Sequence, residues 1–126
     1  MKKYIRYNQD GSVAEEIDVP QSEHIYKDVR ENRIKQGVAV GGLTINGDDQ
    51  TMLRLAGARI KAESDSSFTT VWNGDVTLNA SQIIAASDAM AIHVDKAFKA
   101  YGAVKGNTYN TIAEMEVAFD SAYNQA

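Results

Sequence analysis

The chain has no cysteine and a single proline among its 126 residues. Without thiols it can form no disulfide, zinc–thiolate site, iron–sulfur cluster or catalytic cysteine, so its core must be held by packing. The one proline, Pro20, fixes its own φ angle and has no N–H to donate to a β-ladder. We therefore expect a strand to end just before Pro20 and a connector to begin there.

An excess of positive charge and a long apolar segment are also missing. Thirteen basic against seventeen acidic side chains give a net charge of −4, and the basic residues are scattered along the sequence. Because nucleic-acid-binding proteins gather Lys and Arg on one face, we expect no nucleic-acid partner. No apolar run approaches the ~20 residues that cross a bilayer, and the N-terminus turns polar before a secretory segment could form. We expect no membrane partner and a soluble protein made in the cytoplasm.

The chain contains the same sequence pattern twice between residues 37 and 101: a β-hairpin, a polar cap and an amphipathic helix. In the first copy Gly41-Gly42 suits a tight hairpin turn. Asp48 or Asp49 can then accept a hydrogen bond from the free N–H groups of the next helix. We expect that helix to bury one apolar stripe, made of Met52, Leu53, Ala56, Gly57 and Ile60.

The second copy carries stronger signals. Asn73-Gly74 is the sequence most typical of a two-residue hairpin turn. Asn79, with Gln82 three positions later, predicts a capping box that opens the longest helix, at about residues 80–103. Apolar positions in that helix recur at steps of three and four, which gives a wide face for a core or a partner helix.

The flanking segments complete the expected fold. Alternating residues around a polar turn predict a β-hairpin in residues 1–20, and a charged helix follows up to residue 37. Thr111 with Glu114 predicts a capping box for a last short helix. Separate hairpins favour an α+β fold in which short antiparallel β-hairpins pack with three to four helices. We expect three parts: an N-terminal hairpin (1–20) as a possible docking element, a connecting helix (21–37) and a compact α+β domain (38–126). Alternatively, the hairpin packs edge-on against the main domain.

Few residues suit catalysis or metal binding. His24 and His93 could act as ligands or bases, but neither has a set of His, Asp or Glu at metal-ligand spacing beyond His93 with Asp95. A helix-face or surface role explains both better. Asp48, Asp49 and Asp75 could form a carboxylate pair or a cation site, but helix capping accounts for such residues more simply.

The glycines and serines also lack the spacing of known sites. Glycines 37, 41, 42 and 47 match neither GxGxxG nor GxxxxGK[ST] and are better explained as turns. Serines 22, 81 and 87 lie in no GxSxG setting. We therefore expect no catalytic residue, no metal and no cofactor, and a protein that is not an enzyme.

Aromatic residues offer the remaining candidates. Trp72 could belong to a sugar-stacking surface, although a lone Trp on a hairpin beside an apolar helix more often lies in the core. Tyrosines near the chain ends suit protein contacts that remain partly exposed to solvent. Our candidates for a partner interface are Tyr4, Tyr7, Tyr101, Tyr109 and Tyr123.

A series of short motifs runs in order through residues 30–98. It consists of Arg30 and Arg33, Gly37-Val38, Gly42-Leu43-Thr44-Ile45, Asp48-Asp49-Gln50, Leu55-Ala56-Gly57-Ala58, Val71-Trp72, Val76-Thr77-Leu78 and His93-Val94. This order resembles an uncharacterised domain that recurs in bacteriophage proteins, commonly near the C-termini of tail-fibre and tail-associated proteins. The resemblance brings no catalytic residues with it.

The resemblance implies a non-enzymatic bacteriophage structural protein of the tail, baseplate or fibre region, present in the virion. Its expected partners are other tail or virion proteins and further copies of itself in a symmetric assembly. Two alternatives stay open: a tail-fibre assembly chaperone, and a module that binds host-surface carbohydrate.

Overall fold

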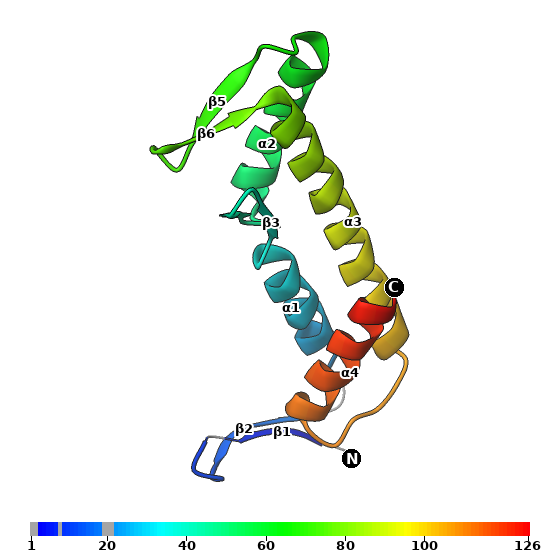
Figure 1. Ribbon diagram of the computed structural model, residues 1–126. Coiled ribbons are helices and arrows are strands. Elements are labelled where there is room, and N and C mark those ends of the chain that lie inside the picture. Colours follow the sequence, from blue (N-terminus) through cyan, green and yellow to red (C-terminus); the bar gives the residue numbers. More distant parts are fainter. Residues whose placement is uncertain (1–2, 8, 19–21) are drawn as a thin grey trace. The chain divides into compact units, whose positions relative to one another are not determined.

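The computed structural model describes residues 3–7, 9–18 and 22–126, and side chains at 9–12 and from residue 24 onward. The described part forms three β-hairpins and four helices (Figure 1). In chain order the elements are β1 (Lys3–Tyr7), β2 (Val13–Asp18), α1 (Ser22–Lys35), β3 (Val38–Val40), β4 (Leu43–Ile45), α2 (Asp49–Ser64), β5 (Thr69–Trp72), β6 (Val76–Asn79), α3 (Ala80–Val104) and α4 (Ile112–Gln125). The α+β class, with short antiparallel hairpins and about four helices, is as predicted.

Two compact units divide the chain. We call residues 33–95 the middle unit; the terminal unit combines the residues up to Asn32 with those from Lys96 onward. The boundaries between them fall inside α1 and α3. The three-part division expected from the sequence, at 1–20, 21–37 and 38–126, is a different partition and stays a prediction.

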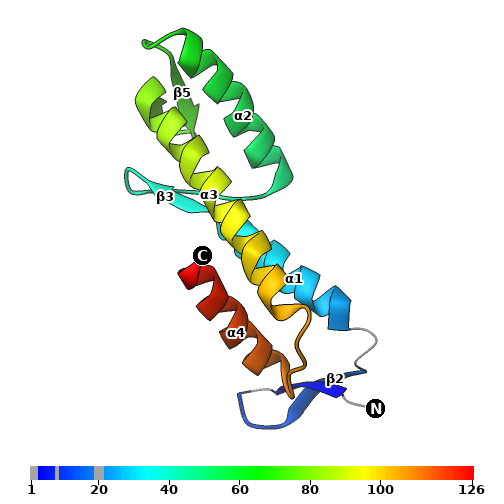
Figure 2. The same cartoon turned by 90° about the vertical axis from the view of Figure 1, so that its right-hand side faces the viewer.

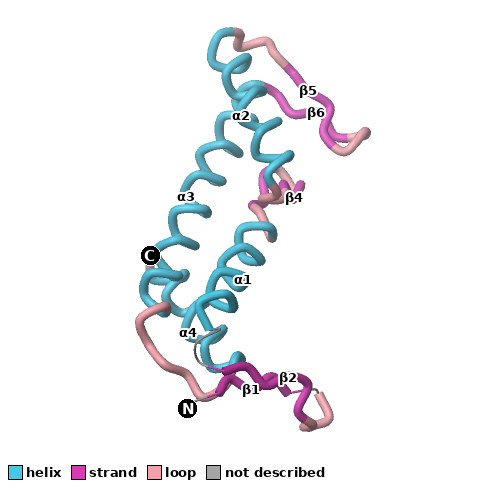
Figure 3. The backbone as a smooth tube through the Cα atoms, turned by 180° about the vertical axis from the view of Figure 1, so that it is seen from behind, coloured by secondary structure: helices cyan, strands magenta, loops and turns pink. Residues whose placement is uncertain are grey.

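Tight turns build the hairpins of the middle unit, whose strands appear in magenta in Figure 3. Val40 pairs with Leu43, so β3 and β4 are joined by Gly41-Gly42 alone, with φ angles of 58° and 80°. Consecutive positive φ angles are what a two-residue hairpin turn of type I′ requires. The β5–β6 turn also has positive φ at Asn73 and Gly74, but its loop includes one more residue, Asp75.

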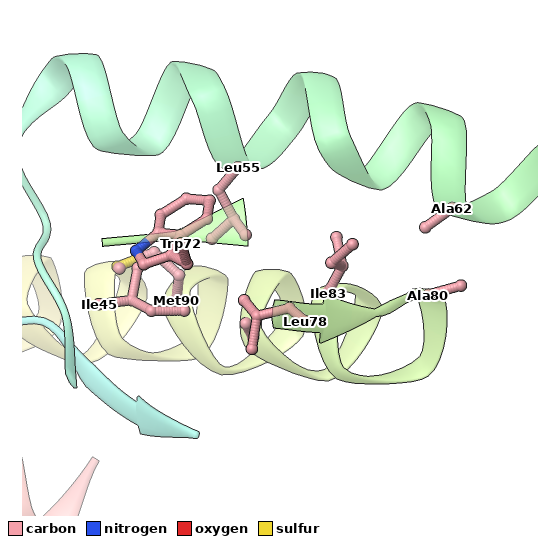
Figure 4. Close-up of a cluster of buried hydrophobic side chains, with 9 residues drawn as sticks. Ile45, Leu55, Ala62, Trp72, Leu78, Ala80, Ile83 and Met90 are labelled. Carbon is pink, nitrogen blue, oxygen red and sulfur yellow. The ribbon is translucent and has the colours of Figure 1, made fainter. Parts of the chain in front are cut away.

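The core of the middle unit lies between α2 and the first half of α3, with β5 and β6 beside them (Figure 4). Leu55 comes from α2, Trp72 from β5, and Ile83 and Met90 from α3. The Trp72 side chain is only 3% exposed, so it belongs to the core, as the sequence predicted. Burying large apolar side chains in this way is the main favourable contribution to folding.

The expected buried stripe of α2 is wrong. Leu53 is 76% exposed and Ile60 is 71% exposed, whereas the fully buried residues of this helix are Leu55 and Ala62. The sequence of α2 carries two apolar faces at helical spacing, one on each side of the helix, and periodicity does not say which faces the core. Contacts with residues distant in the sequence decide it, since Leu55 packs in one cluster with Trp72 and Ile83.

The end of α1 is packed tightly against the segment after β4. A Cβ added at Gly37 would lie 1.8 Å from the carbonyl oxygen of Ile45, and one added at Gly47 would lie 1.9 Å from the carbonyl oxygen of Ile34. Gly37 also has a φ of 73°, which favours glycine at a helix end. The two glycines therefore serve backbone packing, consistent with a structural rather than a phosphate-binding role.

The terminal unit has its own apolar core from α1, α3 and α4. Figure 2 shows α4 in red beside the last part of α3. The buried apolar side chains described here are Ile25, Tyr26, Ala97, Ala100, Val104, Ile112, Met115 and Phe119. The Tyr26 hydroxyl donates to the carbonyl oxygen of Asn107 at 2.9 Å, which joins segments far apart in the sequence.

Helix caps form close to where the sequence predicts them. The amide of Gln82 donates to the Asn79 side chain, and the amide of Asn79 donates back to the Gln82 side chain. At α4, the amide of Glu114 donates to the Thr111 hydroxyl. There the return bond comes from the amide of Asn110, one residue earlier than in a standard capping box.

Candidate interaction surfaces

Three of the five tyrosines expected at an interface are described, and all three belong to the terminal unit. Tyr101, Tyr109 and Tyr123 are each partly exposed. Tyr4 and Tyr7 lie on β1, and their side chains are outside the described part of the chain. The interface assignment for all five stays a prediction.

Tyr101 is part of a cluster of rings and cations on α1 and α3. The guanidinium of Arg30 lies 4.5 Å from the ring centroid of Phe98 and 4.6 Å from that of Tyr101. The ammonium of Lys105 lies 5.5 Å from the Tyr101 ring. Cation–π contacts of this kind hold the rings in place, and Phe98 remains 49% exposed. The cluster is an ordered, half-exposed aromatic surface.

The other two tyrosines make separate contacts. The ammonium of Lys96 on α3 lies 4.9 Å from the Tyr123 ring on α4. The Tyr109 hydroxyl accepts a hydrogen bond from the side-chain amide of Asn107 at 3.4 Å. These contacts orient the rings inside the terminal unit while leaving part of each at the surface.

The two histidines have different environments. His24 lies on α1, exposed, with its Nε2 atom 3.2 Å from the carboxylate of Asp28. His93 is only 5% exposed, and its Nε2 lies 2.9 Å from the carbonyl oxygen of Arg33 and 3.2 Å from that of Ile34. Because both neighbours only accept, we infer that Nε2 carries the proton. His93 is therefore a buried structural residue that ties α3 to the last carbonyls of α1.

The aspartates act mainly as caps and turn residues. Asp48 accepts hydrogen bonds from the amide of Thr51 at 2.8 Å and from its hydroxyl at 2.9 Å. The backbone bond, followed by the hydroxyl bond, lowers the pKa of Asp48. Asp49 opens α2, while Asp75 lies in the β5–β6 turn. Within the described residues, no three His, Cys, Asp or Glu side chains come together in a way that could hold a metal ion.

Trp72 is covered on its ring face. The guanidinium of Arg54 lies 4.1 Å from the ring centroid, and Arg54 also donates to the carbonyl oxygen of Val71. A sugar needs an open aromatic face to stack on. The sugar-stacking role weighed for Trp72 is therefore not available in this structure.

Exposed apolar side chains are the feature that sequence reasoning missed. Among the side chains that the structure describes, six large ones are exposed: Leu53, Ile60, Val71, Ile92, Phe98 and Val117. Single exposed apolar residues are common in soluble proteins. Leu53 and Ile60 differ because they are seven residues apart on one helix and thus share a face. The signal was present in the sequence, where both belonged to the stripe assigned to the core.

No helix in the described part is long and apolar enough to cross a membrane. A family model described as a domain of unknown function, DUF4376, matches residues 21–123. This match extends beyond both ends of the 30–98 segment on which the bacteriophage resemblance rests. No curated protein and no solved structure matches the chain.

Proposed function

The chain belongs to the DUF4376 family, and we propose that it is a non-enzymatic bacteriophage structural protein of the tail, baseplate or fibre region. It acts by packing against copies of itself and against other virion proteins. The observation that carries the proposal is the pair of exposed apolar residues on one face of α2, Leu53 and Ile60. The free energy falls when another protein covers such a face, because apolar surface is removed from water.

The sequence motifs in residues 30–98 supply the link to bacteriophage. Within the structure these motifs become turns, caps and core residues: Gly42 lies in a turn, Asp48 caps α2, and Trp72 and Leu78 lie in the core. The resemblance is therefore carried by residues that build a scaffold. This agrees with a structural role and leaves the exposed faces to determine the partners.

The N-terminal hairpin is the proposed docking element. β1 and β2 form a two-stranded antiparallel sheet, so each strand has one edge that no other described strand pairs with. A partner strand can add to such an edge through main-chain hydrogen bonds. Within the terminal unit β1 contacts α4, and because two strands alone are only marginally stable, a partner strand would stabilise the hairpin further.

Incorporation into particles tests the proposal. We expect a chain lacking residues 1–19 to keep residues 30–126 folded, as shown by far-UV circular dichroism, but to be absent from purified particles. A matched control, Val117→Ala, changes an exposed residue on α4 and should be incorporated normally. A truncated protein that co-purifies with particles at the normal stoichiometry would contradict docking through the hairpin. A full-length protein that binds fibre polypeptide in lysates but is absent from particles would instead identify an assembly chaperone.

A further inference from the structure

We infer that the exposed face of α2 is a self-association surface, against which α2 of a second copy of this chain packs in parallel. The inference deepens the proposed function, because it names the surface through which the copies of a multi-copy assembly contact one another. It rests on three features of α2: the placement of its exposed residues, the glycine at their centre and the charges beside them.

The exposed residues of α2 follow the spacing of a helix–helix seam. Gln50, Leu53, Gly57, Ile60 and Ser64 succeed one another at steps of three and four, and all of them are exposed. Steps of this kind place residues on the line where two parallel helices meet. We call these five residues the α2 seam.

The α2 seam points away from the core of its own unit. Leu55 and Ala62, the buried residues of α2, occupy the opposite side of the helix and point toward α3 in Figure 4. The helix can therefore pack into its own core and against a second helix at the same time. A helix that is apolar on two opposite faces is expected to be covered on both.

Gly57 is placed where a second helix would come closest. It lies inside α2, where glycine destabilises a helix relative to alanine. A Cβ at this position would meet nothing within 4 Å, so no contact with the described residues requires glycine here. Close approach of a second backbone would account for it, because a missing side chain lets helix axes come nearer together.

Charges flanking the α2 seam favour a parallel second copy. One flank carries Lys61 and Arg54, whose guanidinium also lies over Trp72 and donates to the carbonyl oxygen of Val71. The other flank carries Asp49 and Glu63, which also pairs with Arg59. In a parallel pair the two different flanks meet, so the basic flank of one copy faces the acidic flank of the other. In an antiparallel pair each flank meets its own kind, which would bring the two basic side chains together. The distribution of charge along α2 thus favours a parallel over an antiparallel pair of helices.

The area of the α2 seam sets the strength of the contact. At roughly 30 Å² per side-chain carbon, Leu53 and Ile60 together offer about 200 Å² of exposed apolar surface per copy. A standard stable interface buries about 800 Å² per partner. The α2 contact is therefore one of several within an assembly and is weak between free subunits. A covalent cross-link is therefore needed to capture the contact, because free subunits would not form a stable dimer.

Cysteine cross-linking in the full-length chain provides that test, because the natural sequence contains no cysteine. Leu53→Cys and Ile60→Cys are made separately, and the purified proteins are oxidised with copper phenanthroline. A parallel, in-register seam brings each new cysteine close to its own counterpart, so both variants should form disulfide dimers. We expect rates roughly ten-fold above the control, because the contact raises the effective thiol concentration. The matched control is Ile92→Cys, an exposed apolar position on α3.

Three results would overturn the inference. The first is that both seam variants cross-link no faster than Ile92→Cys. The second is that dimers form only when Leu53→Cys and Ile60→Cys are mixed, which would indicate an antiparallel pair. The third is that Gly57→Leu, added to Leu53→Cys, leaves the rate unchanged. We expect Gly57→Leu to reduce it to the control rate, while circular dichroism shows the helix intact because leucine is a good helix former.

The cross-linking result and the particle result are independent. If the seam variants fail to cross-link and the wild-type protein is still found in particles, only the α2 contact is refuted. If they cross-link and the protein is absent from particles, the virion role is refuted and the self-association surface remains.

Discussion

Two glycine-to-alanine substitutions should change the stability of the middle unit in opposite directions. At Gly47 a new Cβ would lie 1.9 Å from the backbone carbonyl oxygen of Ile34, and 3.0 Å is the closest that real Cβ atoms approach. The backbone must therefore move by about 1 Å. At Gly57, in the interior of α2, the same Cβ meets nothing within 4 Å.

The size of the Gly47→Ala effect follows from the contacts that this movement disturbs. The amide of Gly47 donates to the carbonyl oxygen of Lys35 at 3.3 Å, and His93 bonds to the carbonyl oxygens of Arg33 and Ile34 in the same turn of α1. Each hydrogen bond contributes about 1 kcal/mol net, and overpacking costs about 1–3 kcal/mol. We expect Gly47→Ala to lower the free energy of unfolding by about 2–4 kcal/mol. Gly57→Ala should raise it by about 0.5–1 kcal/mol through helix propensity.

Urea unfolding followed by Trp72 fluorescence measures both effects, since the indole is buried in the core of the middle unit. With m values of about 1–3 kcal/mol/M, the Gly47→Ala midpoint should fall by about 1–2 M and the Gly57→Ala midpoint should rise slightly. The m value itself should not change. A Gly47→Ala midpoint equal to that of the wild type would refute the tight packing of α1 against the segment after β4.

Two further substitutions test the roles assigned to His93 and Asp48. His93→Ala removes the imidazole donor from the carbonyl oxygens of Arg33 and Ile34, of which the second still accepts from the amide of Gly37. The free energy of unfolding should fall by about 1–3 kcal/mol, and His93→Gln should recover part of the loss because its amide can donate. Equal losses in a urea titration would contradict the hydrogen-bonding role. Asp48→Asn should keep an N-cap and lose the charge. Because the folded-state pKa of Asp48 is lowered below the ordinary 3.8, its charge stabilises the fold above that pH, and this contribution is lost as the pH falls through the lowered pKa. The melting temperatures of wild type and Asp48→Asn should therefore converge in acid, and a gap that stays constant down to the lowest pH would contradict the assignment.

Local signals in the sequence were enough to locate the turns and caps, although the β5–β6 loop has one residue more than predicted. Gly41-Gly42 and the Asn79–Gln82 capping box depend on residues that are adjacent or a few positions apart, so their geometry is set within the segment itself. The order of helices and hairpins follows from the same signals. This is why the α+β class could be predicted without knowledge of distant contacts.

Features set by distant contacts could not be predicted. The partners of His93 are carbonyl groups about sixty positions earlier, and no local pattern identifies them. The orientation of α2 depends on which of its two apolar faces meets Trp72 and Ile83, so the choice of Leu53 and Ile60 for the core failed. The sequence placed the candidate interface on aromatic residues near the chain ends. The structure adds the α2 face that carries Leu53 and Ile60, which the sequence had assigned to the core.

Quantitative mass spectrometry of purified particles is the most direct test of the structural role proposed for this protein. Under the proposed virion role, phage particles assembled in cells that express the chain are purified through two successive density gradients, and peptides are counted against an abundant virion protein. We expect a fixed stoichiometry that is unchanged between the first and second gradient. Loss of the protein with each purification, or its absence from particles while it is abundant in the infected cell, would refute a structural role in the virion.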